Sequence, residues 1–276
     1  MDDEKIIYNP LVIKSDTSAA NGHPAASAQI EWGKELADFI EKNGYLIKTS
    51  IEEEDGTDLN RKMFVVGNIC PDGIMNHKNY ERSMKLHTHF RDGIPDGDFG
   101  KDGTIEIFEE RLKGFWEKHL EDEKYVRGLY LGYITHMMTD KRFVLYERPK
   151  YFENISVIGL TDHDRETFVY FNRDTDLVDF KLVREMPELL EAKDILEETS
   201  GYYIKDMITS IDLDKSRMWI LNHFFEKEHV IEESRFLDYK SIIKFIDDTV
   251  EYIKKRLLDE KFLINKSRIE KQGNGG

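Results

Sequence analysis

The fold is decided by residues 124–146, KYVRGLYLGYITHMMTDKRFVLY, in which apolar side chains surround most of the helical circumference. A helix with this pattern is buried on all sides. We therefore expect it at the centre of a mostly α-helical bundle. Two polar residues stand out in it, His136 and Asp140, which are four positions apart and so share one face of the helix.

Further helices are expected on both sides of this segment. Apolar residues at three- and four-residue steps predict helices over 27–43, 59–69, 105–121, 185–198, 200–227 and 239–263. Residues 91–103 contain four glycines and one proline, which predicts a surface loop. The segments ISVIGL (155–160) and ETFVYF (166–171) are rich in β-branched and aromatic residues, and this composition favours strands.

Composition and length limit the classes of protein to which the chain can belong. The 276 residues carry a formal net charge of −15, which opposes non-specific binding to nucleic acid. No apolar run reaches about 18 residues and the N-terminus is acidic, so we expect no membrane span and a cytoplasmic location. One helical domain is predicted over residues 26–264, between an irregular N-terminal arm (1–25) and a disordered tail (265–276).

Any metal site must use histidine and carboxylate ligands, because Cys70 is the only cysteine and no pair of thiolates exists. Neutral imidazole and carboxylate are the usual zinc ligands when thiolates are absent. A buried carboxylate such as Asp140 needs a salt bridge, a hydrogen-bond network or a bound cation. A structural pair of His136 with Asp140 and a metal site are both consistent with this spacing.

A second cluster of ligand types precedes the central helix. Asp72 lies in GNICPDG (67–73), at a predicted helix-to-loop junction where its carboxylate either faces a pocket or makes an Asx turn. His87 and His89 follow in KLHTHF (85–90). Residues two apart point to opposite sides of a helix, so only one imidazole reaches a common site in a helix, whereas both can in an extended segment.

The three motifs GNICPDG, SMKLHTHF and YLGYITHMMTD together resemble the zinc-dependent phospholipase C-like family, which is related in fold to bacterial phospholipase C and P1-type nucleases. The resemblance covers about residues 60–145. It implies a divalent metal, zinc, bound by Asp72, His89, His136 and Asp140, with His87 as the alternative to His89. It also implies that Asp72 is catalytic, as a base toward water, and that the substrate is a phosphoester.

The chain departs from the family in the later ligands. The family's additional histidine after the His-x-x-x-Asp pair is absent, and only His163 follows within reach as a substitute. The later His-x-x-x-Glu motif is also absent, although His223 and His229 lie in that region. We therefore expect one or two metal ions rather than three. The resemblance implies a phospholipid or another small phosphodiester as the substrate, and the sequence does not predict an oligomeric state.

Two other functions compete with this interpretation. Asp162, His163 and Asp164 contain the His-Asp dipeptide of HD-type phosphohydrolases, but their polar surroundings predict a loop rather than the apolar helix of those enzymes. The chain is alternatively a non-catalytic helical scaffold that keeps the buried polar residues and acts through a partner. Metal content distinguishes the two interpretations, because the enzyme should contain stoichiometric zinc and the scaffold should not.

Overall fold

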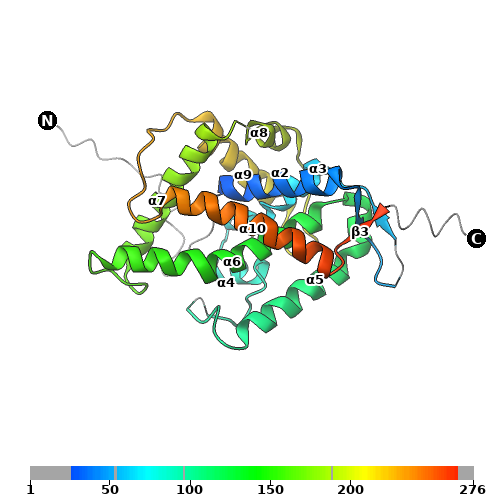
Figure 1. Cartoon of the computed structure of the whole chain (residues 1–276), viewed down its shortest axis with the longest axis horizontal. Coiled ribbons are helices and arrows are strands. Elements are labelled where there is room, and N and C mark those ends of the chain that lie inside the picture. Colours follow the sequence, from blue (N-terminus) through cyan, green and yellow to red (C-terminus); the bar gives the residue numbers. More distant parts are fainter. Residues whose placement is uncertain (1–25, 53–54, 96, 188, 267–276) are drawn as a thin grey trace, which may run out of the picture.

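The structure, a computed structural model, describes residues 26–52, 55–95, 97–187 and 189–266 (Figure 1). This part of the chain is mostly α-helical, as the apolar pattern predicts. The predicted N-terminal arm (1–25) and nearly all of the predicted tail (265–276) lie outside the described residues. No helix within the described ranges is long and apolar enough to cross a membrane.

The described chain consists of short and long helices joined by turns and irregular segments. The helices are α2 (Ala26–Lys42), α3 (Arg61–Gly67), α4 (Arg82–Thr88), α5 (Thr104–Val126), α6 (Leu129–Ser156), α7 (Arg165–Glu185), α8 (Leu189–Glu198), α9 (Ser210–Ile220) and α10 (Tyr239–Asp259), with a 3₁₀ helix η2 (Cys70–Asn76) and a π-helical segment η3 (Leu221–Glu226). A small antiparallel sheet, ordered β2-β1-β3, consists of β1 (Tyr45–Lys48), β2 (Gly56–Thr57) and β3 (Leu263–Asn265).

The central helix of the bundle is α6, as predicted. Every residue from Leu129 to Lys141 is buried, and α2, α3, α5 and α10 all contact this helix. Figure 1 shows α10 lying along α6, with α2 beside α10. The predicted bounds of this helix, 124–146, are wrong at both ends, because residues 124–126 still belong to α5 and α6 runs from Leu129 through Pro149 to Ser156. A proline inside a helix removes one hydrogen bond, and the burial of Tyr151 and Ile155 beyond it offsets that loss.

The two predicted strands at 155–160 and 166–171 are also wrong. The first segment ends α6 and enters a turn, and the second lies inside α7. Thr167 and Phe171 are both buried, at the four-residue step of a helix. Phe171 packs edge-on against Tyr151 of α6, with 4.8 Å between ring centroids. Packing against α6 therefore overrides the strand preference of these residues.

Two other segments differ in part from the predictions. Residues 200–209 are not helical, and α9 begins only at Ser210 after Thr209, whose side chain caps it. Residues 91–103 form the turns predicted for a loop, yet Ile94 and Phe99 are buried in the core. Isolated apolar residues in a glycine-rich stretch carry no period, so their burial is invisible in the sequence pattern.

Two glycines allow α3 and α6 to approach closely. A Cβ atom on Gly132 of α6 would overlap the backbone oxygen of Phe64, and a Cβ on Gly67 of α3 would overlap the backbone oxygen of Leu129. Neither position therefore accepts a larger residue without a shift of the backbone. This contact holds the end of α3, and the η2 helix that follows it, against the middle of α6.

A buried carboxylate caps the start of α6. Arg127 and Gly128 form the turn from α5 with φ of 53° and 139°, a conformation that favours glycine. The Glu123 side chain accepts hydrogen bonds from the backbone N–H groups of Tyr130 and Leu131, at 3.0 and 3.3 Å. Helix N-termini leave such donors without intrahelical partners, so Glu123 satisfies two of them. Burial raises the pKa of Glu123 to about 8.

Candidate metal centre

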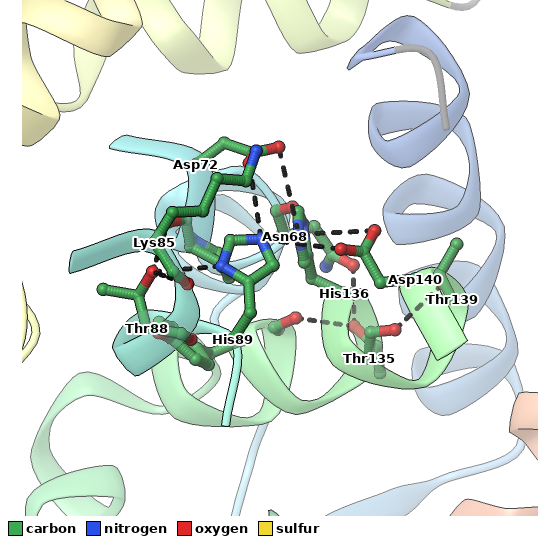
Figure 2. Close-up of polar contacts among 12 residues, drawn as sticks. Asn68, Asp72, Lys85, Thr88, His89, Thr135, His136, Thr139 and Asp140 are labelled. Atoms are coloured by element: carbon green, nitrogen blue, oxygen red, sulfur yellow. Dashed lines mark hydrogen bonds and ion pairs between the residues drawn. The ribbon is translucent and has the colours of Figure 1, made fainter. Parts of the chain in front are cut away.

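Three elements, η2, α4 and α6, place four ligand-type side chains together. Asp72 lies in the first turn of η2, His89 caps the C-terminus of α4, and His136 and Asp140 share one face of α6. Figure 2 shows the two imidazoles and two carboxylates facing one another. Asp72 does follow a helix as predicted, but it lies inside a short 3₁₀ helix that begins at Cys70, rather than in a loop.

The distances within this cluster suit one metal ion. Ligand atoms of Asp72, His89 and His136 all lie within 4.8 Å of one another. The Nε2 atom of His89 lies 3.4 Å from Oδ1 of Asp72, and Nε2 of His136 lies 4.0 Å from Oδ2 of Asp72. A tetrahedral zinc site with metal–ligand distances of about 2.1 Å separates its ligand atoms by about 3.4 Å. The observed spacings are close to that value.

Asp140 adds a second carboxylate to the two histidines. Its Oδ2 lies 3.5 Å from Nε2 of His89, and its Oδ1 lies 3.7 Å from Nε2 of His136. Both distances exceed the 2.7–3.2 Å of ordinary N–H···O hydrogen bonds. The buried Nε2 of His136 makes no hydrogen bond to any described residue. The two histidines are therefore farther from Asp140 than hydrogen-bonded partners are, and the donor set of two imidazoles and two carboxylates fits a divalent cation.

The outer nitrogen of each imidazole is held by an oxygen. Nδ1 of His136 donates to the backbone oxygen of Asn68 at 2.6 Å, because a carbonyl can only accept. Nδ1 of His89 lies 3.0 Å from the hydroxyl of Thr88, which itself donates to the backbone oxygen of Pro71. A proton on each Nδ1 leaves the Nε2 lone pair directed into the cluster. Such bonds orient metal-binding histidines in proteins.

These orienting residues are supported in turn by the core. The hydroxyl of Thr135 donates to the side-chain oxygen of Asn68 at 2.6 Å, and the Asn68 amide donates to the backbone oxygen of Phe64 at 2.8 Å. The hydroxyl of Tyr133 donates to the backbone oxygen of Thr88. The orienting and supporting roles of Asn68, Thr88 and Thr135 were not predicted from the sequence, although Asn68 lies in the GNICPDG motif.

Burial determines the charge state and access of the site. Burial lowers the pKa of His89 to about 3, so its imidazole is neutral near neutral pH, which is the form that binds metal. The His136 side chain is fully buried, whereas the side chains of Asp72 and Asp140 are 20% and 10% exposed. Solvent therefore reaches the cluster on its carboxylate side. Next to His89 and Asp140, a small pocket has room for roughly one water molecule.

The other two candidate histidines lie elsewhere. His87 is exposed on the opposite side of α4, and its Nδ1 lies 2.8 Å from Oδ2 of Asp92. The side chain of His163 is 91% exposed in the loop before α7, next to Asp162. The hydroxyl and backbone N–H of Thr161 donate to the carboxylate of Asp164 in the same loop. Neither histidine belongs to the cluster of Asp72, His89 and His136.

The comparisons with known proteins add no relative: no family model matches the chain, and no significant match exists among the curated proteins or the solved structures.

Proposed function

We propose that the protein is a metal-dependent hydrolase of phosphoesters that uses zinc. The observation that supports this is the convergence of two Nε2 atoms and two carboxylates, from η2, α4 and α6, in one nearly closed cluster. A divalent ion bound there supplies a Lewis acid that lowers the pKa of water to about 7 and offsets charge developing on phosphoryl oxygens. The resemblance of the three motifs to the phospholipase C-like family supports a phosphoester as the substrate class.

The four side chains have different roles in this proposal. His89 and His136 are nearly closed off from solvent and hold the metal, with their Nδ1 atoms fixed by Thr88 and Asn68. Asp72 and Asp140 bind the metal and balance its two positive charges. Asp72 is the more exposed carboxylate, so it is also the group that orients the attacking water or accepts its proton.

The first test is metal content and turnover of the purified protein. Elemental analysis after purification without chelators should give a stoichiometric divalent metal. The protein should hydrolyse para-nitrophenyl phosphate or its bis diester, lose that activity with a chelator and regain it with zinc. If metal-loaded protein turns over no member of a broad panel of phosphomonoesters and phosphodiesters, the hydrolase is refuted and the non-catalytic scaffold is favoured.

A pair of histidine variants tests the assignment of the ligands. His136→Ala should lose both metal and turnover, because it removes a buried ligand. His87→Ala should retain both, because His87 faces Asp92 at the surface of α4. Loss of metal from His87→Ala together with its retention in His136→Ala would contradict the site described above.

A further inference from the structure

Lys85 is a buried cation next to the candidate metal ligands. It lies on α4 one helical turn before His89, and its side chain is only 4% exposed. Its Nζ lies 2.7 Å from Oδ1 of Asp72 and 3.3 Å from the sulfur of Met75. Figure 2 shows the ammonium group reaching Asp72 beside the ring of His89. Burial lowers the pKa of Lys85, while the carboxylate of Asp72 opposes that shift.

The contacts of Lys85 do not use all its donors. An ammonium group carries three N–H donors, and a thioether sulfur is only a weak acceptor. Within the described ranges of the chain, Asp72 is the only oxygen acceptor that Lys85 contacts. Removing an ammonium from water costs several kcal/mol, and one carboxylate shared with a metal repays that cost incompletely. The group is therefore suited to an additional anionic partner.

The net charge of the metal-loaded cluster also favours an anionic partner. With a divalent ion bound, the ion and Lys85 carry three positive charges, against two negative charges on Asp72 and Asp140. An imidazole that binds a metal ion through Nε2 is neutral, so the two histidines add no charge. The loaded site therefore has an excess of one positive charge, in a location where burial limits screening. If Lys85 only neutralised Asp72, a bound metal ion would make it redundant.

We propose that Lys85 is an anion-binding residue that holds a phosphoryl oxygen at this site. The inference rests on the metal site of the proposed function and names the group that recognises its substrate. Lysine binds phosphate as a point charge and donates a charge-assisted hydrogen bond to it. Inorganic phosphate and phosphodiesters share this chemistry, and they differ in charge and in the number of free oxygens.

The test is equilibrium binding by calorimetry to zinc-loaded protein, with inorganic phosphate and dimethyl phosphate as the two probes. Lys85→Met keeps an unbranched side chain of similar length and removes the charge. Its Kd for phosphate should rise about ten- to a hundredfold, the range for one hydrogen bond to a charged group. Its zinc affinity should be equal or higher, because a positive charge next to the ion is gone. Weakening for phosphate alone assigns free phosphate as the ligand, and weakening for both probes assigns the esters as well.

The matched control is Lys78→Met, which removes an exposed lysine from the turn before α4. It should leave both affinities unchanged. Lys85→Gln is the second uncharged variant, and retained zinc binding shows that either variant is folded. Unchanged phosphate affinity in folded Lys85 variants overturns the inference. Loss of zinc from these variants also overturns it, because Lys85 would then only position Asp72.

The result of this binding test can be distinguished from the result of the hydrolysis test of the proposed function. Phosphate binding that depends on Lys85, without hydrolysis of any ester, would leave the inference standing and refute the hydrolase. If the protein hydrolyses esters but Lys85→Met leaves its phosphate affinity unchanged, the hydrolase is supported and the inference about Lys85 is refuted.

Discussion

At the scale of single residues, the cluster depends on which nitrogen of each imidazole faces inward. The backbone oxygen of Asn68 holds Nδ1 of His136, so Nε2 is the atom near Asp140. A second His–Asp pair, His119 with Asp122 on α5, provides a contrast: there Nδ1 lies 2.9 Å from the carboxylate, an ordinary hydrogen-bond distance. The longer distances around His136 are compatible with ligands placed around a cation.

Asp140→Asn tests that difference. The amide keeps the size of the side chain and loses the negative charge that binds a cation, so the Kd for zinc should rise at least about tenfold. Competition with a chromogenic chelator measures it. Asp122→Asn makes the same change in the pair with His119 and should leave the zinc affinity unaltered. Equal zinc affinities in wild type and Asp140→Asn would show that Asp140 is not a ligand.

At the scale of elements, the site depends on how closely α3 and α6 pack. Asn68 and η2 follow α3 directly, so any shift of α3 along or away from α6 moves the carbonyl that orients His136. The contact of Gly67 with Gly132 sets that spacing. We therefore expect a packing glycine to affect metal affinity although it touches no ligand.

Gly132→Ala should lower both stability and metal affinity. The added methyl group overlaps the backbone at Phe64, and overpacking of this kind costs about 1–3 kcal/mol. The control is Gly114→Ala on the exposed face of α5, where the new Cβ meets no atom within 4 Å. That change should raise the free energy of unfolding by about 0.5–1 kcal/mol. Urea unfolding and zinc titration measure the two effects, and an unchanged zinc affinity in Gly132→Ala would contradict this link.

The cap of α6 makes a prediction about pH. The pKa of Glu123 is about 8 in the folded protein, against an ordinary value of 4.5. Between these values the folded state keeps a proton that the unfolded state releases, so this group lowers the free energy of unfolding as the pH rises. Glu123→Gln keeps an acceptor oxygen and does not titrate. The wild type should therefore lose stability relative to Glu123→Gln from about pH 4.5 to about pH 8.

Urea unfolding of both proteins in the presence of chelator measures this difference, since the metal site is then the same in each. A stability difference that stays constant across the range, or that grows in favour of the wild type, would show that the Glu123 carboxylate is ionised throughout. In that case its bonds to the N–H groups of Tyr130 and Leu131 outweigh its burial.

At the scale of the whole molecule, a bound ion would tie together η2, α4 and α6. Hydrogen bonds already link these elements, since Thr88 donates to Pro71 and Tyr133 donates to Thr88. A ligand that binds only the folded state adds stability by mass action, about 2.7 kcal/mol at a concentration 100 times Kd. Metal removal should therefore be visible in thermal unfolding.

Chelation should lower the Tm of the zinc-loaded protein by roughly 5–10 °C, the shift that this free energy produces in a chain of this size. Differential scanning calorimetry measures it. The double variant His136→Ala, Asp140→Ala should show no change on chelation, because it lacks two of the four ligands. If chelator leaves the Tm of the wild type unchanged, a metal-free network of hydrogen bonds and ion pairs in the cluster is favoured.

Features that depend on neighbours along the chain could be predicted from the amino-acid sequence alone. The apolar circumference of residues 124–146 predicts a buried central helix, and a four-residue step places His136 and Asp140 on one face. Both are consequences of helical geometry alone. The assignment of Asp72 to the same site came from the resemblance of its motif, and the structure brings Asp72 to His136.

Which distant groups meet depends on how the helices pack, and this could not be predicted from the sequence. The sequence left His87 and His89 as alternatives, and the choice follows from α4 docking with its C-terminus toward α6 while His87 faces Asp92. Lys85 appeared in the sequence as one of many lysines, and its burial against Asp72 results from that docking. The segment 166–171 has strand-like composition, yet it is helical because Phe171 packs on Tyr151. Local propensities are worth tenths of a kcal/mol per residue, and burial of one aromatic side chain exceeds them.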